Sequence, residues 1–141
     1  MNLTQYTPHH LPSCTSEERA RLDVIETHLL SLPQVRVPIK ESLHNGVYTR
    51  VAIIPGGVLM MGCTLKVRTT LTVVGRVEVT VGGRATHVDG CEVFEGEAGR
   101  KTCFLTHTDT TLIMTFRTDA KDLKAVRELL TDELLQEERD L

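Results

Sequence analysis

The residues of this chain whose types and spacing could do chemistry are a histidine–aspartate pair and a group of basic side chains. His107 and Asp109 stand two residues apart at a predicted turn between strands. Such a pair can transfer protons or supply half of a metal site. The alternative is structural, because an aspartate in a turn often caps the backbone while the histidine is partly buried. No suitable serine or cysteine nucleophile accompanies the pair, so the sequence favours the structural interpretation.

The basic residues are candidates for binding an anion. Arg68 lies in a predicted strand over residues 63–74, on the same face as Thr64, because strand side chains alternate with a period of two. Arg100 and Lys101 follow a glycine, where a backbone nest can contact a phosphate. A guanidinium matches phosphate and carboxylate groups bidentately, so Arg68 with Lys101 could hold such an anion. The alternatives are a solvated charged turn and, because apolar residues occupy the opposite strand face, an Arg68 that points to solvent or to a partner subunit.

Short alternating strands must position these residues. From residue 47 to 117, β-branched and polar residues alternate in runs separated by glycines, which is typical of a sandwich or barrel. A capping box of Thr15 and Glu18 begins a helix before this region, and an apolar stripe from Leu123 onward predicts a second helix after it. We therefore expect a single domain made of an extended arm (1–14), a helix (15–32), an all-β barrel (33–118) and a C-terminal helix (119–141).

The same alternation predicts which side chains fill the core. One stripe of the first helix and one face of each strand carry aliphatic residues at the required spacing. The predicted core consists of Leu22, Ile25, Leu29, Val51, Ile53, Leu71, Val73, Val77, Val79, Leu112, Met114 and Phe116.

Composition limits the possible partners and compartments. The chain has 141 residues, 40% hydrophobic and 25% charged, with a formal net charge of −3, so it has no basic footprint for nucleic acid. No apolar run approaches the roughly 20 residues that span a bilayer, and the first residues lack the pattern of a signal peptide. The four cysteines form no CxxC pair and are expected to be reduced.

Several framing segments recur in the order found in a known family. They are Gly46-Val47-Tyr48-Thr49-Arg50, Ile54-Pro55-Gly56-Gly57-Val58, Gly75-Arg76-Val77 and Gly99-Arg100-Lys101-Thr102. This order, from about residue 32 to the final helix, resembles small cupin-like proteins encoded by tailed phages and prophages. The resemblance implies a small jelly-roll barrel and a phage origin, and it names no reaction.

The resemblance also implies that the metal ligands of the first cupin motif are lost. Counting back from Gly75 places Arg68 at the glutamate position, and Gly62 and Thr64 at the two histidine positions. These residues cannot replace the imidazole and carboxylate ligands of a transition metal. We therefore expect no metal and no cofactor. The alignment points Arg68 into the barrel lumen, which conflicts with the hydrophobic pattern.

The leading hypothesis is a non-enzymatic, phage-encoded homo-oligomer that acts as an accessory or virion structural protein. Its expected partners are copies of itself, with other phage structural or host proteins as further possibilities, and its expected place is the virion or the host cytoplasm. The arm is predicted to contribute to contacts between copies. The alternative is a module that binds a small anionic, nucleotide-like ligand or counters host defence. A metal-dependent cupin enzyme is the weakest of the three hypotheses.

Overall fold

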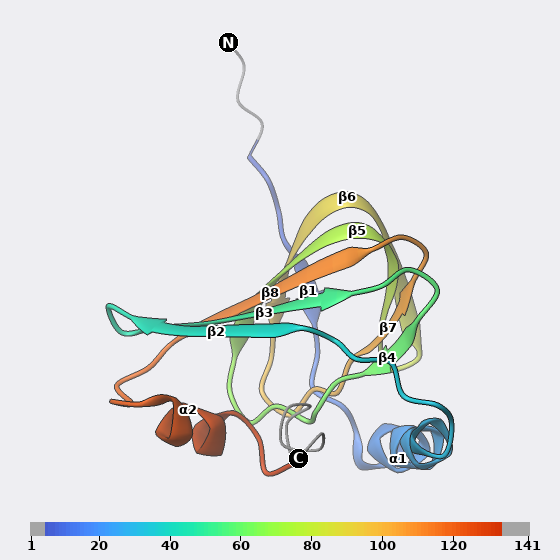
Figure 1. Ribbon diagram of the computed structural model, residues 1–141, viewed down its shortest axis with the longest axis horizontal. Helices are drawn as coiled ribbons and strands as arrows, with labels where there is room; N and C mark the ends of the chain where they lie inside the picture. The colour runs from blue at the N-terminus through green and yellow to red at the C-terminus, as the bar shows by residue number, and fades with distance from the viewer. Residues whose placement is uncertain (1–4, 134–141) are drawn as a thin grey trace.

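The computed structural model describes residues 5–133, which form one curved sheet and two helices (Figure 1). In chain order the elements are β1 (His9–Leu11), α1 (Ser16–Leu30), β2 (Ile39–His44), β3 (Val47–Ile54), β4 (Leu59–Met61), β5 (Thr69–Val81), β6 (Arg84–Gly96), β7 (Cys103–Thr106), β8 (Thr110–Arg117) and α2 (Leu123–Leu130). Apart from β1, which precedes α1, the strands lie between the two helices as predicted, and the architecture confirms the cupin-like jelly-roll class.

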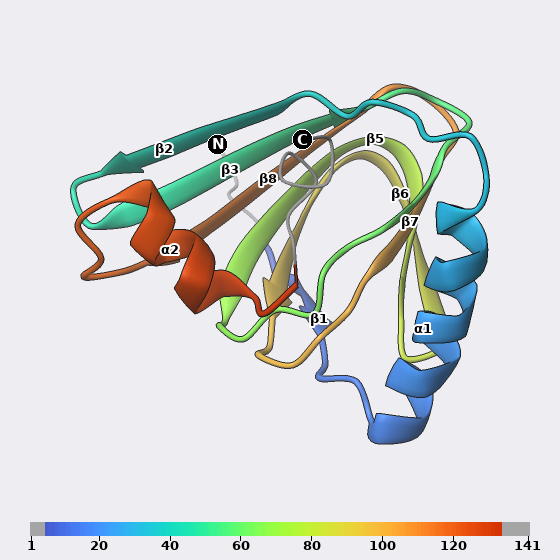
Figure 2. The same ribbon diagram turned by 60° about the horizontal axis from the view of Figure 1, so that its bottom comes forward.

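The eight strands form one sheet with an open end. Their order is β1-β6-β5-β8-β3-β2, with β7 pairing with both β4 and β5. All pairings are antiparallel except that of β1 with β6. The sheet curls around the core without closing into a complete barrel, and α1 and α2 flank its open end (Figure 2). Side chains that approach this end from the strands and from the helices can therefore meet.

The central strand β5 changes partner at a glycine. Residues before Gly75 pair with β8, and residues after it pair with β7. Gly75 has a φ of 141°, and a Cβ at this position would lie 2.8 Å from the Thr110 hydroxyl oxygen. The absence of a side chain therefore lets β8 approach closely at the bend and keeps β5 continuous through it.

The predicted core is correct on β5 and β8 and wrong on β3 and α1. Six of the predicted aliphatic side chains are buried, and Phe116 is partly buried: Leu71, Val73, Val77, Val79, Leu112 and Met114. On β3 the opposite face points inward, so Tyr48, Ala52 and Ile54 are buried while Ile53 is exposed. Both faces of β3 carry aliphatic residues, so the alternation alone did not distinguish them.

The two helices differ in how they attach to the sheet. Helix α1 begins with the predicted capping box of Thr15 and Glu18, but none of its residues is buried and Ile25 is 45% exposed. Helix α2 buries Val126 and Leu130 completely. It is shorter than the predicted 119–141 because the backbone is extended at Thr131, and residues 134–141 lie outside the described part of the chain. No helix of the described residues is long and apolar enough to cross a membrane.

The described part of the predicted arm packs on its own sheet. Residues His9–Leu11 form β1, which pairs in parallel with β6, and the Leu11 side chain is only 3% exposed. The Tyr6 hydroxyl donates to the Glu92 carboxylate. These contacts give the arm a role within one chain, so deleting residues 1–14 would remove part of the core as well as any contact between copies.

The segment before β5 is a loop, where a strand over 63–74 was predicted. Its backbone N–H groups bind partners outside any strand ladder: that of Gly62 donates to the Thr102 carbonyl, that of Leu65 to the Arg100 carbonyl and that of Lys66 to the Leu130 carbonyl. The prediction was wrong because polar and apolar residues alternate here as they do in a strand. The period-two argument that placed Thr64 and Arg68 on one strand face therefore does not apply.

Candidate ligand-binding site

An apolar cavity of about 140 Å³ lies inside the curved sheet near its open end. Its walls come from β2, β3, β4, β5, β7, β8, the loop before β5 and the end of α2. Most of the lining side chains are aliphatic, aromatic or sulfur-containing, including Leu71, Phe104, Leu112 and Met114. Two arginines, Arg50 and Arg100, are the charged residues among the described lining.

Arg100 is buried beside this cavity with its hydrogen bonding incomplete. The side chain is 2% exposed. Its Nη1 donates to the Glu97 carbonyl oxygen at 3.2 Å, and its Nη2 donates to the Thr69 hydroxyl. Within the described chain, Nε is buried and has no hydrogen-bond partner. Burial lowers the pKa of Arg100 to about 10, with the Glu97 charge acting in the opposite direction, so the guanidinium remains charged at neutral pH.

A glycine makes room for this guanidinium. A Cβ at Gly96, the last residue of β6, would lie 2.7 Å from Nε of Arg100. No real Cβ approaches another atom so closely, so any other residue at position 96 would force the arginine to move. The absence of a side chain at Gly96 therefore lets the Arg100 guanidinium lie directly against the backbone of β6.

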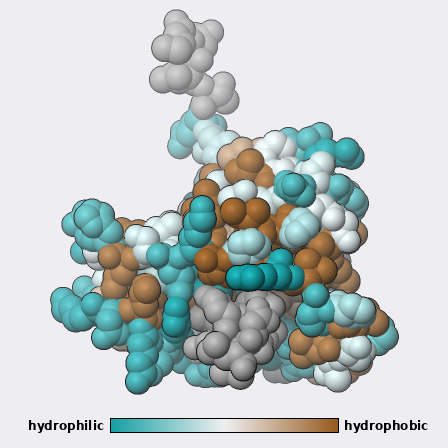
Figure 3. Space-filling view, viewed as in Figure 1, coloured by the Kyte–Doolittle hydropathy of each residue, from teal (hydrophilic) through white to brown (hydrophobic). Residues whose placement is uncertain are grey.

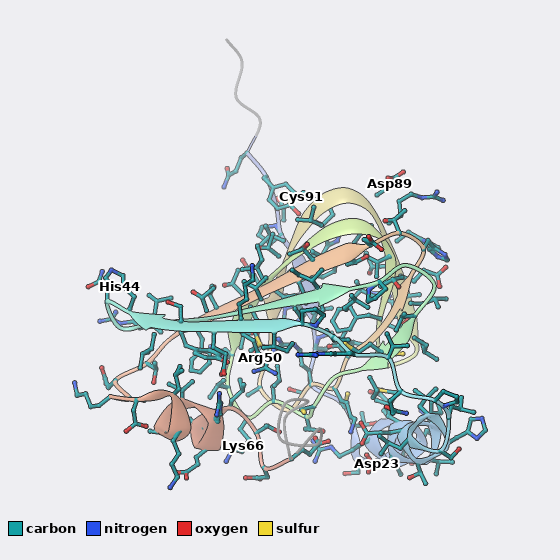
Figure 4. The ribbon with its side chains drawn as sticks, viewed as in Figure 1. Asp23, His44, Arg50, Lys66, Asp89 and Cys91 are labelled. Atoms are coloured by element: carbon teal, nitrogen blue, oxygen red, sulfur yellow. The ribbon has the colours of Figure 1, made fainter. Side chains whose placement is uncertain are left out.

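The second arginine of the lining belongs to a buried polar cluster on β2 and β3. Arg50 lies 3.5 Å from the Glu41 carboxylate, and its Nη1 lies 3.4 Å from the Tyr48 hydroxyl. Arg127 of α2 donates to both carboxylate oxygens of Glu41, and Tyr48 donates to one of them at 2.7 Å. Figure 4 shows Arg50 on the side of β3 that faces the helices. One buried carboxylate thus serves two guanidinium groups and joins α2 to the sheet.

The cluster shifts the pKa values of its members in opposite directions. Burial alone would raise the pKa of Glu41, but hydrogen bonds from Arg127 and Tyr48 outweigh it and hold the pKa below its usual value. Burial raises the pKa of Tyr48 to about 12, and the hydrogen bond from Arg50 opposes this shift. The cluster is therefore a charged carboxylate with a neutral phenol at neutral pH.

Lys101 occupies a different environment although it follows Arg100 in the chain. Its ammonium group lies 3.1 Å from Glu133, 3.3 Å from Glu26 and 3.5 Å from Asp23, and its side chain is 1% exposed. Burial alone would lower the pKa of Lys101, but Glu133 and Glu26 outweigh burial and raise it. Asp23, labelled in Figure 4, and Glu26 belong to α1, so Lys101 links that helix to the chain after α2.

The other predicted anion-binding residues lie elsewhere. The Arg68 side chain is 82% exposed and lies 3.0 Å from the Glu97 carboxylate, outside the lumen. The Thr64 backbone binds two residues that follow α2: its N–H donates to the Glu133 carboxylate, and its carbonyl accepts from the Thr131 hydroxyl. The structure therefore does not bring Arg68 and Lys101 together. The alignment with the cupin motif predicted that Arg68 points into the lumen, and that prediction was wrong.

His107 and Asp109 are exposed and have separate partners among the described contacts. Nε2 of His107 lies 3.9 Å from the Glu78 carboxylate. The Asp109 carboxylate accepts from the Gly56 backbone N–H at 3.0 Å. Asp109 thus caps a backbone, as the structural interpretation expected, but in a distant loop and not in its own turn.

The donor atoms around the cavity do not suit a resident metal ion. The fold class includes metal-binding cupins, whose sites use histidine and carboxylate ligands. Over residues 5–133, no group of three or more His, Cys, Asp or Glu residues could hold a metal. The cavity wall instead carries two guanidinium groups, which repel a cation. The described lining therefore does not fit a resident metal ion.

Similar structures show the fold alone. Salicylate 1,2-dioxygenase from Pseudoaminobacter salicylatoxidans, in adducts with gentisate, has a TM-score of 0.53 and 13% identity, over 81% of this chain and 34% of that one. Protein NMB1881 from Neisseria meningitidis has a TM-score of 0.50 and 12% identity, over 66% and 95%. The cupin domain of Schizosaccharomyces pombe Cnp3 has a TM-score of 0.49 and 18% identity, over 72% and 73%.

No protein-family model matches this chain, and no curated protein sequence matches it either. The residues of the lumen must therefore carry the functional argument. The sequence singled out Arg100, but as part of a surface turn, and it missed Arg50 and Glu41. An arginine and a glutamate within alternating apolar strands are the signal that could have indicated a buried polar cluster.

Proposed function

We propose that this protein is a non-enzymatic binding module whose lumen takes a small anionic ligand. The observation that carries the proposal is Arg100, a charged side chain that is 2% exposed beside an apolar cavity and has a buried Nε without a partner in the described chain. Leaving a buried donor unsatisfied costs about 1–3 kcal/mol, and more when the group is charged. An anion in the cavity would supply an acceptor for N–H groups of Arg100 and a second counter-charge beside that of Glu97.

The lining supports binding more than catalysis. Arg50 and Arg100 are hydrogen-bond donors only, and the nearest carboxylate of the cluster, that of Glu41, already accepts from Arg127 and Tyr48. Arg50 already lies beside the Glu41 carboxylate, so the best-supported role for Arg100 is to hold an anion.

The test is an NMR titration of the full chain with three probes: acetate, benzoate and inorganic phosphate. At least one probe should shift resonances of residues that line the cavity, such as the methyl groups of Leu71 and Met114. The variant Arg100→Met, which keeps the size and removes the charge, should lose these shifts, whereas Arg68→Met, at an exposed arginine, should keep them. Unchanged cavity resonances with all three probes would refute the proposal.

A second candidate function, homo-oligomeric assembly, has its own observation. The end of α1, the chain after it and β4 expose apolar side chains around a groove of about 240 Å³, among them Leu30, Leu32, Val35 and Leu59. Figure 3 shows hydrophobic side chains reaching the surface over this part of the molecule. Exposed apolar patches of this kind often mark interaction sites.

This candidate includes the phage accessory or virion role implied by the sequence resemblance. Analytical ultracentrifugation at micromolar concentration should show an oligomer that Leu30→Asp and Leu59→Asp dissociate. A folded monomer, unchanged by these substitutions, would count against assembly and with it against the structural role. Localisation in a virion or host cytoplasm, and action against host defence, remain predictions.

A further inference from the structure

We infer that the ligand is a monocarboxylate with a compact apolar body, such as a single aromatic ring or a short branched chain, and not a phosphate or nucleotide. This inference rests on the proposed function and names the chemical class that the lumen would accept. It follows from three properties of the site: the charge of Arg100, the volume and the nature of the walls.

The single charge of Arg100 matches an anion that carries one negative charge. A guanidinium has five N–H donors. On Arg100 two of these five donate, one from Nη1 to the Glu97 carbonyl and one from Nη2 to the Thr69 hydroxyl, and the buried Nε–H has no acceptor in the described chain. A carboxylate carries one negative charge and can be satisfied by charge-assisted hydrogen bonds from Arg100, which lines the cavity.

A phosphate requires more than this lumen offers. Phosphate groups carry up to two negative charges and three acceptor oxygens, and proteins usually hold them with several donors, a helix N-terminus or a backbone nest. The two nearby glycines do not provide such a nest. The guanidinium itself fills the space beside Gly96, and the Gly99 N–H already donates to the Leu65 carbonyl. A phosphate with two negative charges would therefore enter this mainly apolar cavity with part of its charge unbalanced.

The volume and walls select the rest of the ligand. A dry apolar cavity of about 150 Å³ is known to hold one benzene molecule, and this cavity measures about 140 Å³. A nucleoside would not fit wholly within that space. The walls contain Phe104 and the thioethers of Met60, Met61 and Met114, which adapt to apolar bodies of different shape and contact aromatic rings favourably. A ring or branched chain would bury its apolar surface against them.

The experiment compares benzoate with two molecules that each lack one of its features. Benzyl alcohol has a similar shape without the charge, and inorganic phosphate has the charge without the apolar body. Binding to the full chain is measured by isothermal titration calorimetry at pH 7, with adenosine monophosphate as a nucleotide probe. Benzoate should bind most tightly, and Arg100→Met should weaken it roughly 10- to 100-fold, as expected from the loss of a hydrogen bond to a charged group.

Two further variants separate charge from packing. Arg100→Lys keeps the charge and should retain part of the preference for benzoate over benzyl alcohol, while Arg68→Met should bind benzoate as the unmodified chain does. Binding of phosphate or adenosine monophosphate through Arg100, with none of benzoate, would overturn the ligand class and leave the proposed function standing. Binding of benzyl alcohol as tight as that of benzoate, unaffected by Arg100→Met, would overturn both.

Discussion

Arg100 and Lys101 are adjacent, both almost fully buried, and their surroundings are opposite. Lys101 is surrounded by three carboxylates from two separate parts of the chain. Arg100 donates to a carbonyl and a hydroxyl, and its Nε lacks a partner in the described chain. The comparison indicates that burial of a cation does not by itself identify a site. What separates a structural cation from one that can bind a ligand is whether carboxylates of the fold already contact it directly.

Removing Lys101 should cause the largest loss of stability among the changes proposed for this comparison. Lys101→Met leaves Glu26, Glu133 and Asp23 facing one another without their shared cation. Removing one partner of a buried pair costs about 3–5 kcal/mol, and we expect roughly 2–4 because Asp23 is 60% exposed. Urea unfolding followed by circular dichroism measures the loss. A cost below about 1 kcal/mol would show that Lys101 does not hold α1 to the sheet.

Acid should weaken the contact between Lys101 and Glu133. Hydrogen bonds from the Thr64 backbone and Lys101 outweigh the effect of burial and hold the pKa of Glu133 below its usual value of 4.5. A group with a lowered pKa stabilises the fold above its unfolded-state pKa and loses that contribution as the pH falls through the folded-state pKa. The free energy of unfolding should therefore decrease below about pH 4.5. The decrease should be smaller in Lys101→Met and unchanged in Arg100→Met, and identical pH slopes in all three proteins would contradict the assignment.

A methyl group at position 96 should disturb the arginine without touching the lysine. Gly96→Ala places a Cβ within 2.7 Å of Nε of Arg100, so the guanidinium must leave its place. We expect a cost of about 1–3 kcal/mol, as for overpacking a core, together with weaker benzoate binding. The double variant Gly96→Ala/Arg100→Met tests the cause, because the methionine should recover most of the lost stability. No recovery would mean that the strain lies in the backbone of β6.

Removing the charge of Arg100 should have the smallest effect on stability. Arg100→Met replaces a buried, incompletely satisfied cation with an apolar side chain of similar length, a change that is often neutral or stabilising. We expect a change within about 1 kcal/mol in the same urea experiment, and within about 0.5 for the exposed control Arg68→Met. A loss as large as that of Lys101→Met would remove the distinction between the two cations.

The sequence predicted which segments form helices and strands better than it predicted which face of each strand points inward. Capping chemistry is a local signal, so the start of α1 at the Thr15 cap was predicted correctly. The inward face of β3 was not, because aliphatic residues lie on both of its faces. A strand was predicted through Thr64 and Arg68, where hydrogen bonds to distant residues impose a loop.

The site could be predicted only in part. Arg100 and Lys101 were selected as basic residues, but their roles depend on partners 31 and 32 residues away or more, such as Thr69 and Glu133. Nothing in the local sequence distinguishes an arginine that approaches Gly96 inside the lumen from one in a solvated turn. The cavity itself arises from the curvature of the sheet and from the position of α2, which no short pattern encodes.

The most direct test of the account observes the Nε–H group of Arg100. In a ¹H–¹⁵N spectrum of the arginine side chains, assigned with Arg100→Met, benzoate should shift the Arg100 Nε–H resonance strongly, and benzyl alcohol should not. The Arg68 resonance should stay unchanged in both titrations. An Arg100 Nε–H resonance that does not move at saturating benzoate would show that the guanidinium is not the anion-binding group, and the central claim would then be wrong.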